Sequence, residues 1–264
     1  MVFLGNELGH GPNLGRDLAS QIGYRRWVEM VTSEHPFMPT AISPGIVLWL
    51  ATVAVLASLL ALLTMAVMDD PTPSQDIAIM DWMAGWQLPG QVNFFEVLSV
   101  LTGVQAGLIY GPAGIVILLL MRKVRAAIAF FVVGITVAVV ATLGDSTLGE
   151  MVSRGRPLDD AGYSTPSFPS GHVFGSTVFF SFIGFLAVYY RLNKKALIPL
   201  LAFVVAIIIL VGPARVNAQV HFPSDVAAGY LLAALWLLVI IPAFLFVRGT
   251  GCGSSRQSRS DLSV

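Results

Sequence analysis

The stretch IVLWLATVAVLASLLALLTMAVM, residues Ile46–Met68, decides the fold class of this chain. It holds no charged side chain and exceeds the about 20 apolar residues that a helix needs to cross a bilayer. Only helices and closed barrels satisfy their backbone hydrogen bonds in lipid. Five further apolar stretches follow: Leu98–Met121, Ala126–Leu143, Val173–Tyr190, Ala196–Gly212 and Val226–Val247. The sequence therefore predicts an all-α fold, an integral membrane bundle of six transmembrane helices.

The composition agrees with this class. Of 264 residues, 56% are apolar and only 11% are charged, whereas soluble domains carry about 25% charged residues. The formal net charge is zero, which argues against a nucleic-acid partner. Cys252 is the single cysteine, so an intrachain disulfide and a cysteine-rich metal site are both excluded. The sequence carries no signal for the oligomeric state.

Lysine and arginine are distributed unevenly among the loops. Of the fifteen such residues, all but three lie in the N-terminal segment, residues 122–125, residues 191–195 and the C-terminal tail. Short loops rich in Lys and Arg stay on the cytoplasmic side, so both termini are predicted to be cytoplasmic. The loop Asp69–Asn93 has no Lys or Arg and is predicted to be external, as are segments 144–172 and 213–225. We expect residence in the plasma membrane.

Three regions are expected along the chain. Residues 1–44 form a cytoplasmic N-terminal arm, which either includes an interfacial helix or stays loosely ordered; residues 45–247 form the six-span domain; residues 248–264 form a disordered cytoplasmic tail. In the first external loop, Ile79, Trp82, Met83 and Trp86 follow helical spacing. That helix lies either on the membrane surface or against the outer ends of the bundle.

The three remaining cations lie in the external segments, together with two histidines and one carboxylate: Arg154, Arg156, Arg215, His172, His221 and Asp225. Arginines bind phosphate through their forked N–H donors, and histidine is the commonest acid–base group. Cations and histidines gathered at one membrane face indicate a site for a phosphorylated lipid headgroup, with membrane lipids around it.

The segment Pro169-Ser170-Gly171-His172 directly precedes the fourth span. Ser170 suits the N-cap position of a helix, and Gly171 offers a backbone N–H that no side chain obstructs. A helix N-terminus is a ready anion site, and His172 would lie in its first turn. Taken alone, the segment can also be a helix cap followed by an interfacial histidine.

His221 lies just before the sixth span, and Asp225 lies in its first turn. At this separation Asp225 can accept a hydrogen bond from one ring nitrogen of His221 and turn the other nitrogen outward. Arg154 and Arg156, which flank Gly155, suit bidentate phosphate contacts. Alone, each motif has a structural explanation, as a capping carboxylate or as headgroup anchors. Three separate loops that supply such groups to one face favour a phosphate site.

Three segments resemble the signatures of the type 2 phosphatidic acid phosphatase family: Gly149–Pro157, Pro169–His172 and Ala214–Asp225. The second signature, Pro-Ser-Gly-His, is complete. In the third, Arg215, His221 and Asp225 match with the family spacing, and Ala214 replaces a serine. The order of the segments and the six-span layout also agree with the family, and the resemblance covers roughly residues 76–245.

The resemblance implies metal-independent hydrolysis of a lipid phosphate or diphosphate through a phosphohistidine intermediate, on the extracytoplasmic face. Phosphatidate, phosphatidylglycerol phosphate and polyprenyl diphosphates are the substrate classes it allows. It implies that His221 is the nucleophile, Asp225 its orienting residue and His172 the general acid. The implied phosphate ligands are Arg156, Arg215, Ser170 and Gly171, with Arg154 as a further candidate. No metal or other cofactor is implied.

One residue departs from the family pattern. The first signature places a lysine seven residues before the arginine that is Arg156 here, and that position holds Gly149. Loss of one preorganised donor costs about 2.7–4 kcal/mol, roughly 10²–10³ in rate. Two alternatives therefore stay open beside a hydrolase: a weakened or non-catalytic homologue that binds lipid phosphates, and a phosphotransferase that passes the phosphoryl group to another acceptor.

Overall fold

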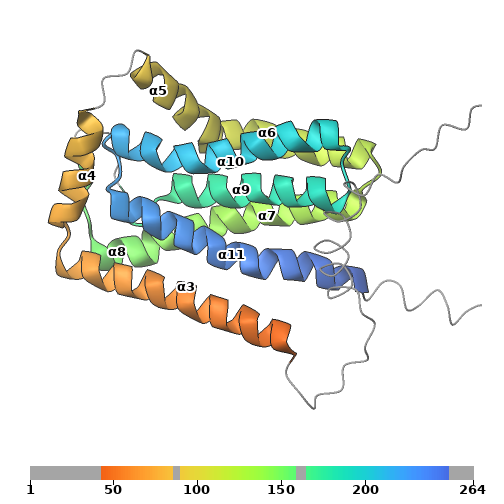
Figure 1. The fold of residues 1–264 in the computed structure, drawn as a ribbon, viewed down its shortest axis with the longest axis horizontal. Coiled ribbons are helices and arrows are strands. Elements are labelled where there is room, and N and C mark those ends of the chain that lie inside the picture. The colour runs from red at the N-terminus through yellow and green to blue at the C-terminus, as the bar shows by residue number, and fades with distance from the viewer. Residues whose placement is uncertain (1–42, 86–89, 159–164, 250–264) are drawn as a thin grey trace, which may run out of the picture. The chain divides into compact units, whose positions relative to one another are not determined.

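The regular elements of the computed structural model are all helical in the residues that it describes, 43–85, 90–158 and 165–249 (Figure 1). They are α3 (Pro44–Asp69), α4 (Ser74–Ala84), α5 (Gln91–Thr102), α6 (Val104–Leu120), α7 (Val124–Leu143), the π-helical η1 (Gly144–Gly149), α8 (Glu150–Val152), α9 (Gly171–Tyr189), α10 (Lys194–Asn217) and α11 (Pro223–Gly249). This confirms the all-α prediction. Nearly all of the predicted arm and tail lies outside the described residues, so both stay predictions.

Five described helical runs are long and apolar enough to cross a membrane: α3, the run Val124–Val152, α9, α10 and most of α11. A sixth span is counted if α5 and α6, which are bent by 53° at a break, cross the membrane together. Gly103 causes this break, because its extended backbone ends α5 and begins α6. Five of the six predicted spans are thus confirmed as continuous helices, whereas the second, Leu98–Met121, corresponds to two helices joined at a break.

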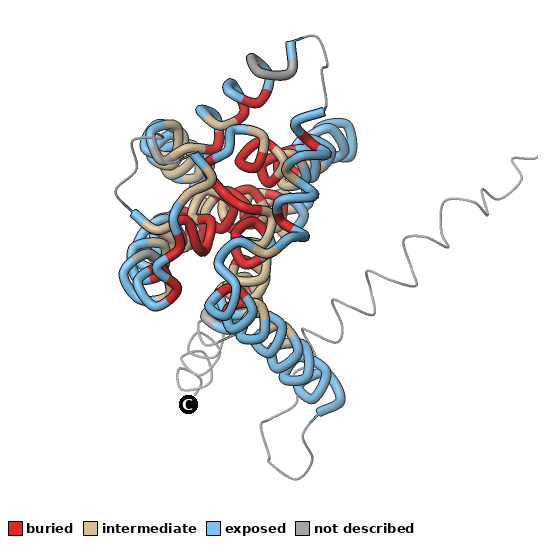
Figure 2. The backbone as a smooth tube through the Cα atoms, turned by 90° about the vertical axis from the view of Figure 1, so that its left-hand side faces the viewer, coloured by how far each residue is buried: buried red, intermediate tan, exposed pale blue. Residues whose placement is uncertain are grey.

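Helix α9 forms the centre of the bundle and packs against α7, α10 and α11. Its buried residues Phe174, Val178 and Phe182 form one apolar core with residues of α7 and α11. Close approach at its N-terminus depends on Gly229 of α11, where a Cβ atom would lie 2.8 Å from the carbonyl oxygen of Ser170. Figure 2 shows the buried residues gathered inside the bundle.

Helix α3 contacts the bundle sparingly. Its apolar side chains are exposed along most of the helix, and only Thr64 and Val67 are buried (Figure 2). Exposed Leu, Ile and Val side chains over such a length would be unfavourable in water and are favourable in lipid tails. The burial pattern therefore agrees with a lipid-facing span.

The alternating helices bring distant segments together at two opposite ends. One end, here called the histidine end, comprises residues 153–158, 165–172 and 215–225; the other, the cationic end, comprises residues 121–125 and 190–195. Helix α4 lies across the histidine end in contact with α10 and α11 (Figure 1).

Only part of the α4 stripe packs on the bundle. Met80 and Met83 pack against residues of α9, α10 and α11, whereas Ile79 and Trp82 are exposed. The helix therefore packs against the outer ends of the bundle through its methionines, and its position on the membrane surface stays a prediction. Trp86 lies outside the described residues.

Candidate active site

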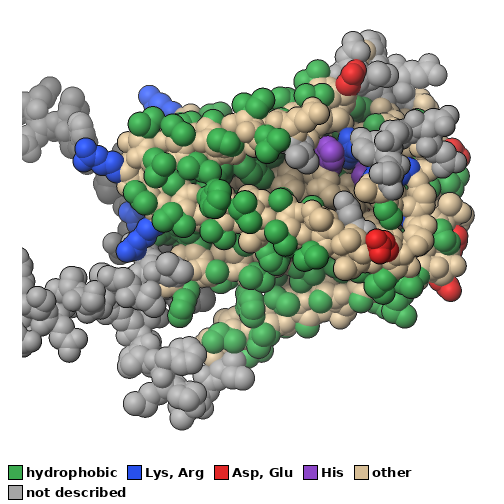
Figure 3. All heavy atoms as spheres, turned by 180° about the vertical axis from the view of Figure 1, so that it is seen from behind, with side chains coloured by type: hydrophobic (Ala, Val, Ile, Leu, Met, Phe, Trp, Pro, Cys, Tyr) green, Lys and Arg blue, Asp and Glu red, His purple; other side chains and the backbone are tan. Residues whose placement is uncertain are grey.

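Two histidines and two arginines from the three segments of the histidine end lie near one another. Nη1 of Arg156 lies 3.3 Å from Nε2 of His221. His172, in the first turn of α9, lies within electrostatic range of Arg215, His221 and Arg156. Figure 3 shows histidine side chains beside Lys or Arg side chains in a hollow near the end where the acidic residues gather. The structure thus brings together the residues on which the predicted site depends.

The ring of His221 is buried and held by a backbone carbonyl. Its Nδ1 lies 2.7 Å from the carbonyl oxygen of Ser167, and it lies 3.6 Å from Oδ2 of Asp225. A carbonyl oxygen only accepts hydrogen bonds, so Nδ1 carries the proton and Nε2 keeps its lone pair, which lies 3.3 Å from the donor Nη1 of Arg156. We had expected Asp225 to be the orienting acceptor, but the shorter contact is with Ser167.

The surroundings of His221 favour the neutral ring. Burial lowers the pKa of His221 below its ordinary value of 6.5, and the charges of Arg156 and Arg215 lower it further. Asp225, whose Oδ2 lies 3.6 Å from Nδ1, opposes this shift because its negative charge favours the protonated ring. Because the net pKa shift is downward, Nε2 is unprotonated and nucleophilic at neutral pH.

Asp225 is fully buried and belongs to an ion-pair network. Its Oδ1 accepts a 2.6 Å hydrogen bond from Nη1 of Arg154, and its Oδ2 accepts from the backbone N–H of Phe222 at 2.8 Å. Nη2 of Arg154 donates at 2.6 Å to Asp76, which projects from the first turn of α4. Asp76 also accepts hydrogen bonds from the N–H and hydroxyl groups of Ser224 at the start of α11.

Arg154 does not join the arginines beside the histidines. Its side chain is 1% exposed, and its remaining contacts are with the carbonyl oxygen of Pro71, the hydroxyl of Ser224 and the ring of Phe222. These partners occupy its donors, so the arrangement leaves little capacity for a phosphate group. These contacts do not support the expectation that Arg154 binds phosphate. They indicate instead that Arg154 holds Asp225 in position.

The N-terminus of α9 presents polar atoms with no partner. Among the described residues, the Oγ of Ser170 and the Nε of Arg215 are buried without a hydrogen bond. Ser170 occupies the N-cap position as predicted, yet its hydroxyl caps nothing. Beside it, a Cβ atom built on Gly171 would meet no atom within 4 Å, so space is open there. Buried donors are rarely left unpaired, and the unpaired hydroxyl of Ser170 lies one residue from this open space at the helix N-terminus.

Gly149 ends the π-helical turn η1 and packs against the loop that leads to α9. A Cβ atom at this position would lie 3.2 Å from the carbonyl oxygen of Phe168 and 3.3 Å from Cβ of Pro166. The same loop carries the Ser167 carbonyl that holds His221. The glycine is thus a close-packing residue in this chain, and a longer side chain there would press on the loop.

Sequence reasoning missed three residues of this site. Asp76 is one of four aspartates in its loop, and no spacing distinguished it. Ser167 acts through its carbonyl oxygen, which every residue has, and Ser224 acts as a bridge between Asp76 and Arg154. Within the described residues, no group of three or more His, Cys, Asp or Glu side chains is placed to hold a metal ion.

Fold and site define a membrane-embedded helical protein with a buried histidine flanked by arginines at one end of its bundle. The family model of the PAP2 superfamily matches residues 125–248, so this segment of the chain is similar to that superfamily. The resemblance noted in the sequence is thereby confirmed.

One solved structure has the same fold. It is described as the crystal structure of the first transmembrane PAP2 type phosphatidylglycerolphosphate phosphatase from Bacillus subtilis. The match has a TM-score of 0.59 at 22% sequence identity and covers 71% of this chain and 93% of that chain. No curated protein matches the chain in sequence.

Proposed function

We propose that this protein hydrolyses a lipid phosphate or diphosphate without a metal ion, through a phosphohistidine at His221. The match of residues 125–248 to the PAP2 superfamily supports lipid phosphate hydrolysis at the level of the family. The observation that carries the finer proposal is the position of Nε2 of His221, which is unprotonated and lies 3.3 Å from Arg156. A nucleophile beside a phosphate-binding cation is the arrangement that phosphoryl transfer requires.

In the first step, the Nε2 lone pair of His221 attacks phosphorus, and the bond from phosphorus to the lipid oxygen breaks. The negative charge of the bound phosphate would keep His172 protonated, and His172 would give that proton to the leaving oxygen. The new bond leaves the imidazole ring positively charged, and the Ser167 carbonyl and Asp225 beside Nδ1 stabilise this charge. Arg156, Arg215, the Ser170 hydroxyl and the Gly171 N–H would hold the phosphoryl oxygens.

In the second step, water gives a proton to His172 and attacks phosphorus. The nitrogen–phosphorus bond breaks, inorganic phosphate leaves and His221 returns to its neutral form. Positive charge on the arginines does the work that a metal ion does in many phosphoryl-transfer sites. Asp76 and Arg154 would not touch the substrate. They would hold Asp225 in place at the start of α11.

The substrate class follows from the position of the site at the ends of apolar helices, where a headgroup can enter and lipid tails can stay in the bilayer. Phosphatidate, phosphatidylglycerol phosphate and a polyprenyl diphosphate all satisfy this description. The charge bias of the loops supports a plasma-membrane protein whose histidine end faces the outside. Labelling of a cysteine placed at exposed Gly155 by an impermeant thiol reagent in intact cells tests this orientation.

The test of the function is phosphate release from purified protein in detergent, across these three substrates, with EDTA present. The expected result is turnover of at least one substrate by the wild type and none by His221→Asn. Brief reaction with radiolabelled substrate should also leave a label that resists base and is lost in acid, as expected for phosphohistidine. Strict dependence on added Mg²⁺, or full activity in His221→Asn, would contradict the proposal.

A non-catalytic lipid-phosphate binder is the second candidate, and Gly149 is the observation that favours it. The family lysine is missing there, and Arg154 is committed to two carboxylates and does not replace it. Saturable binding of phosphatidate with no phosphate release and no labelled histidine would establish this alternative.

A further inference from the structure

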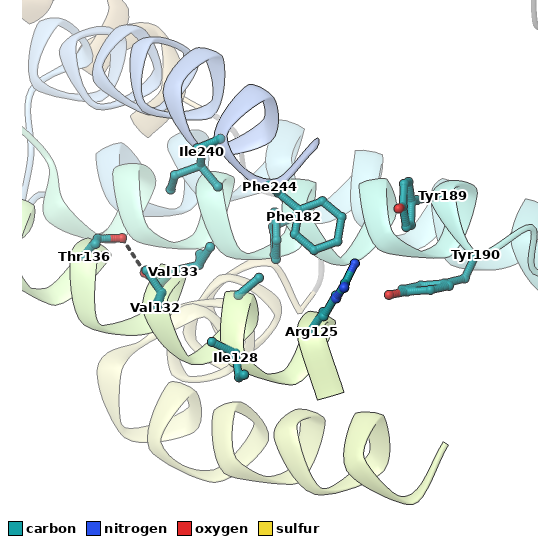
Figure 4. A pocket seen from close by; sticks show the side chains of 12 residues that line it. Arg125, Ile128, Val132, Val133, Thr136, Phe182, Tyr189, Tyr190, Ile240 and Phe244 are labelled. Atoms are coloured by element: carbon teal, nitrogen blue, oxygen red, sulfur yellow. Dashed lines mark hydrogen bonds between the residues drawn. The ribbon is translucent and has the colours of Figure 1, made fainter. Parts of the chain in front are cut away.

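A cavity of about 580 Å³ opens between α7, α9 and α11, away from the histidines. Its walls are mostly apolar and include Ile128, Val132, Phe182 and Phe244, as Figure 4 shows. This volume lies within the range of about 300–1,000 Å³ that is typical of small-molecule sites. The cavity shares no residue with the site at the histidine end.

A cation lies at one end of this cavity. Arg125 projects from the first turn of α7 toward the end of α9, where Tyr189 and Tyr190 also line the cavity (Figure 4). Lys123 lies 4.7 Å from the centre of the Tyr190 ring, which places a second positive charge nearby. Tyrosine and arginine at the end of a span are typical of the level of lipid headgroups. An apolar cavity that ends in cations matches the two parts of an anionic lipid.

The charge of the whole cationic end agrees with this match. Arg122, Arg191, Lys194 and Lys195 are exposed there, in addition to the two cations at the cavity. The sequence has no Asp or Glu between residues 97 and 144 or between residues 172 and 224. No carboxylate from α7, α9 or α10 therefore neutralises Arg125, and an anion is the complementary ligand.

The geometry points to a binding site for an anionic glycerophospholipid, with its phosphate at Arg125 and an acyl chain in the cavity. This lipid would be a bound component of the leaflet at the cationic end and would not be the substrate. The inference does not depend on the proposed reaction, because it uses different residues at the opposite end of the bundle.

The experiment uses delipidated full-length protein in a neutral detergent, with lipid binding followed by native mass spectrometry. The probes are phosphatidylglycerol and phosphatidylcholine with the same acyl chains. A Lys or Arg near the surface contributes about 1 kcal/mol toward an anionic lipid, which is about fivefold in affinity. We expect the wild type to prefer phosphatidylglycerol, and Arg125→Gln to weaken that lipid about fivefold without affecting phosphatidylcholine.

Two further variants separate a defined site from diffuse attraction. Lys195→Gln removes one exposed charge at the same end outside the cavity and should leave the preference intact. Ala243 lines the cavity, so Ala243→Phe places a ring in it and should weaken the binding of both lipids. If that variant fails to fold, the comparison of Arg125→Gln with Lys195→Gln is sufficient to test the inference. Equal binding of the two lipids, or equal losses in Arg125→Gln and Lys195→Gln, would overturn the inference.

Discussion

Replacement of Arg154 by lysine separates the two roles that this residue could have. Its guanidinium joins Asp76 and Asp225 at 2.6 Å each, and the side chain is 1% exposed. Lysine keeps one positive charge but lacks the fork that reaches both carboxylates at once. We therefore expect Arg154→Lys to act through the stability of the protein and through the position of Asp225.

The magnitude follows from the contacts that are lost. Removing one partner of a buried ion pair costs about 3–5 kcal/mol. The lower end applies here, since Asp76 keeps two hydrogen bonds from Ser224 and one ion pair can survive. At about 2–4 °C for each kcal/mol in a chain of this size, we expect the melting temperature to fall by roughly 6–12 °C. Displacement of Asp225 should also lower kcat by up to about 10².

The matched control is Arg156→Lys, two residues further along. Arg156 is half-buried. Its Nη1 donates to the carbonyl oxygen of Val220 at 2.8 Å, a bond that a lysine ammonium can also make, and its contacts with His221 Nε2, Thr165 and the Pro166 carbonyl are longer, at 3.2–3.3 Å. This variant should nearly keep the wild-type melting temperature and should weaken inhibition by orthovanadate, an analogue of the phosphoryl group, about tenfold.

The assays are tryptophan fluorescence during heating and vanadate inhibition of phosphate release. Arg154→Lys should lower the melting temperature and leave the inhibition constant of vanadate unchanged. Arg156→Lys should nearly keep the melting temperature and raise the inhibition constant of vanadate. If Arg154→Lys melts like the wild type and loses vanadate affinity, then Arg154 binds phosphate and the positioning role is refuted.

Three further predictions concern the same site. Because the pKa of His221 is lowered, its neutral reactive form persists as the pH falls through 6.5, so the acid limb of kcat/KM should lie below pH 6.5; a limb at or above it contradicts the assignment. Gly149→Ala should lower kcat, because its Cβ would press on the Phe168 carbonyl at 3.2 Å; unchanged kcat would show that the loop yields freely. Ser170→Ala should raise stability by about 1 kcal/mol, since it removes an unpaired buried hydroxyl, and should weaken vanadate inhibition about tenfold. A loss of stability with unchanged inhibition would mean that Ser170 is structural only.

Hydropathy predicted the spans well because the preference of a helix for lipid depends on its own side chains. The bounds of α9 and α10 differ from the predicted ones by a few residues at polar ends. The second span is the exception, since its bend at Gly103 also depends on packing: a Cβ there would lie 3.5 Å from Nε2 of His172. The sequence shows that this span contains glycine, but it does not show that the helix breaks at Gly103.

The sequence by itself determined that the chain forms a lipid-embedded helical bundle and that its outlying arginines and histidines gather at one end. Apolar length and the alternation of spans are local properties that can be counted along the chain. Only the tertiary structure distinguished the contacts of one arginine from those of another. Arg154 and Arg156 are identical side chains two residues apart, yet one pairs with Asp76 from α4 and the other lies beside His221. Their partners are carboxylates and carbonyl oxygens far away in the sequence, and such partners are set by packing, which leaves no local pattern to read.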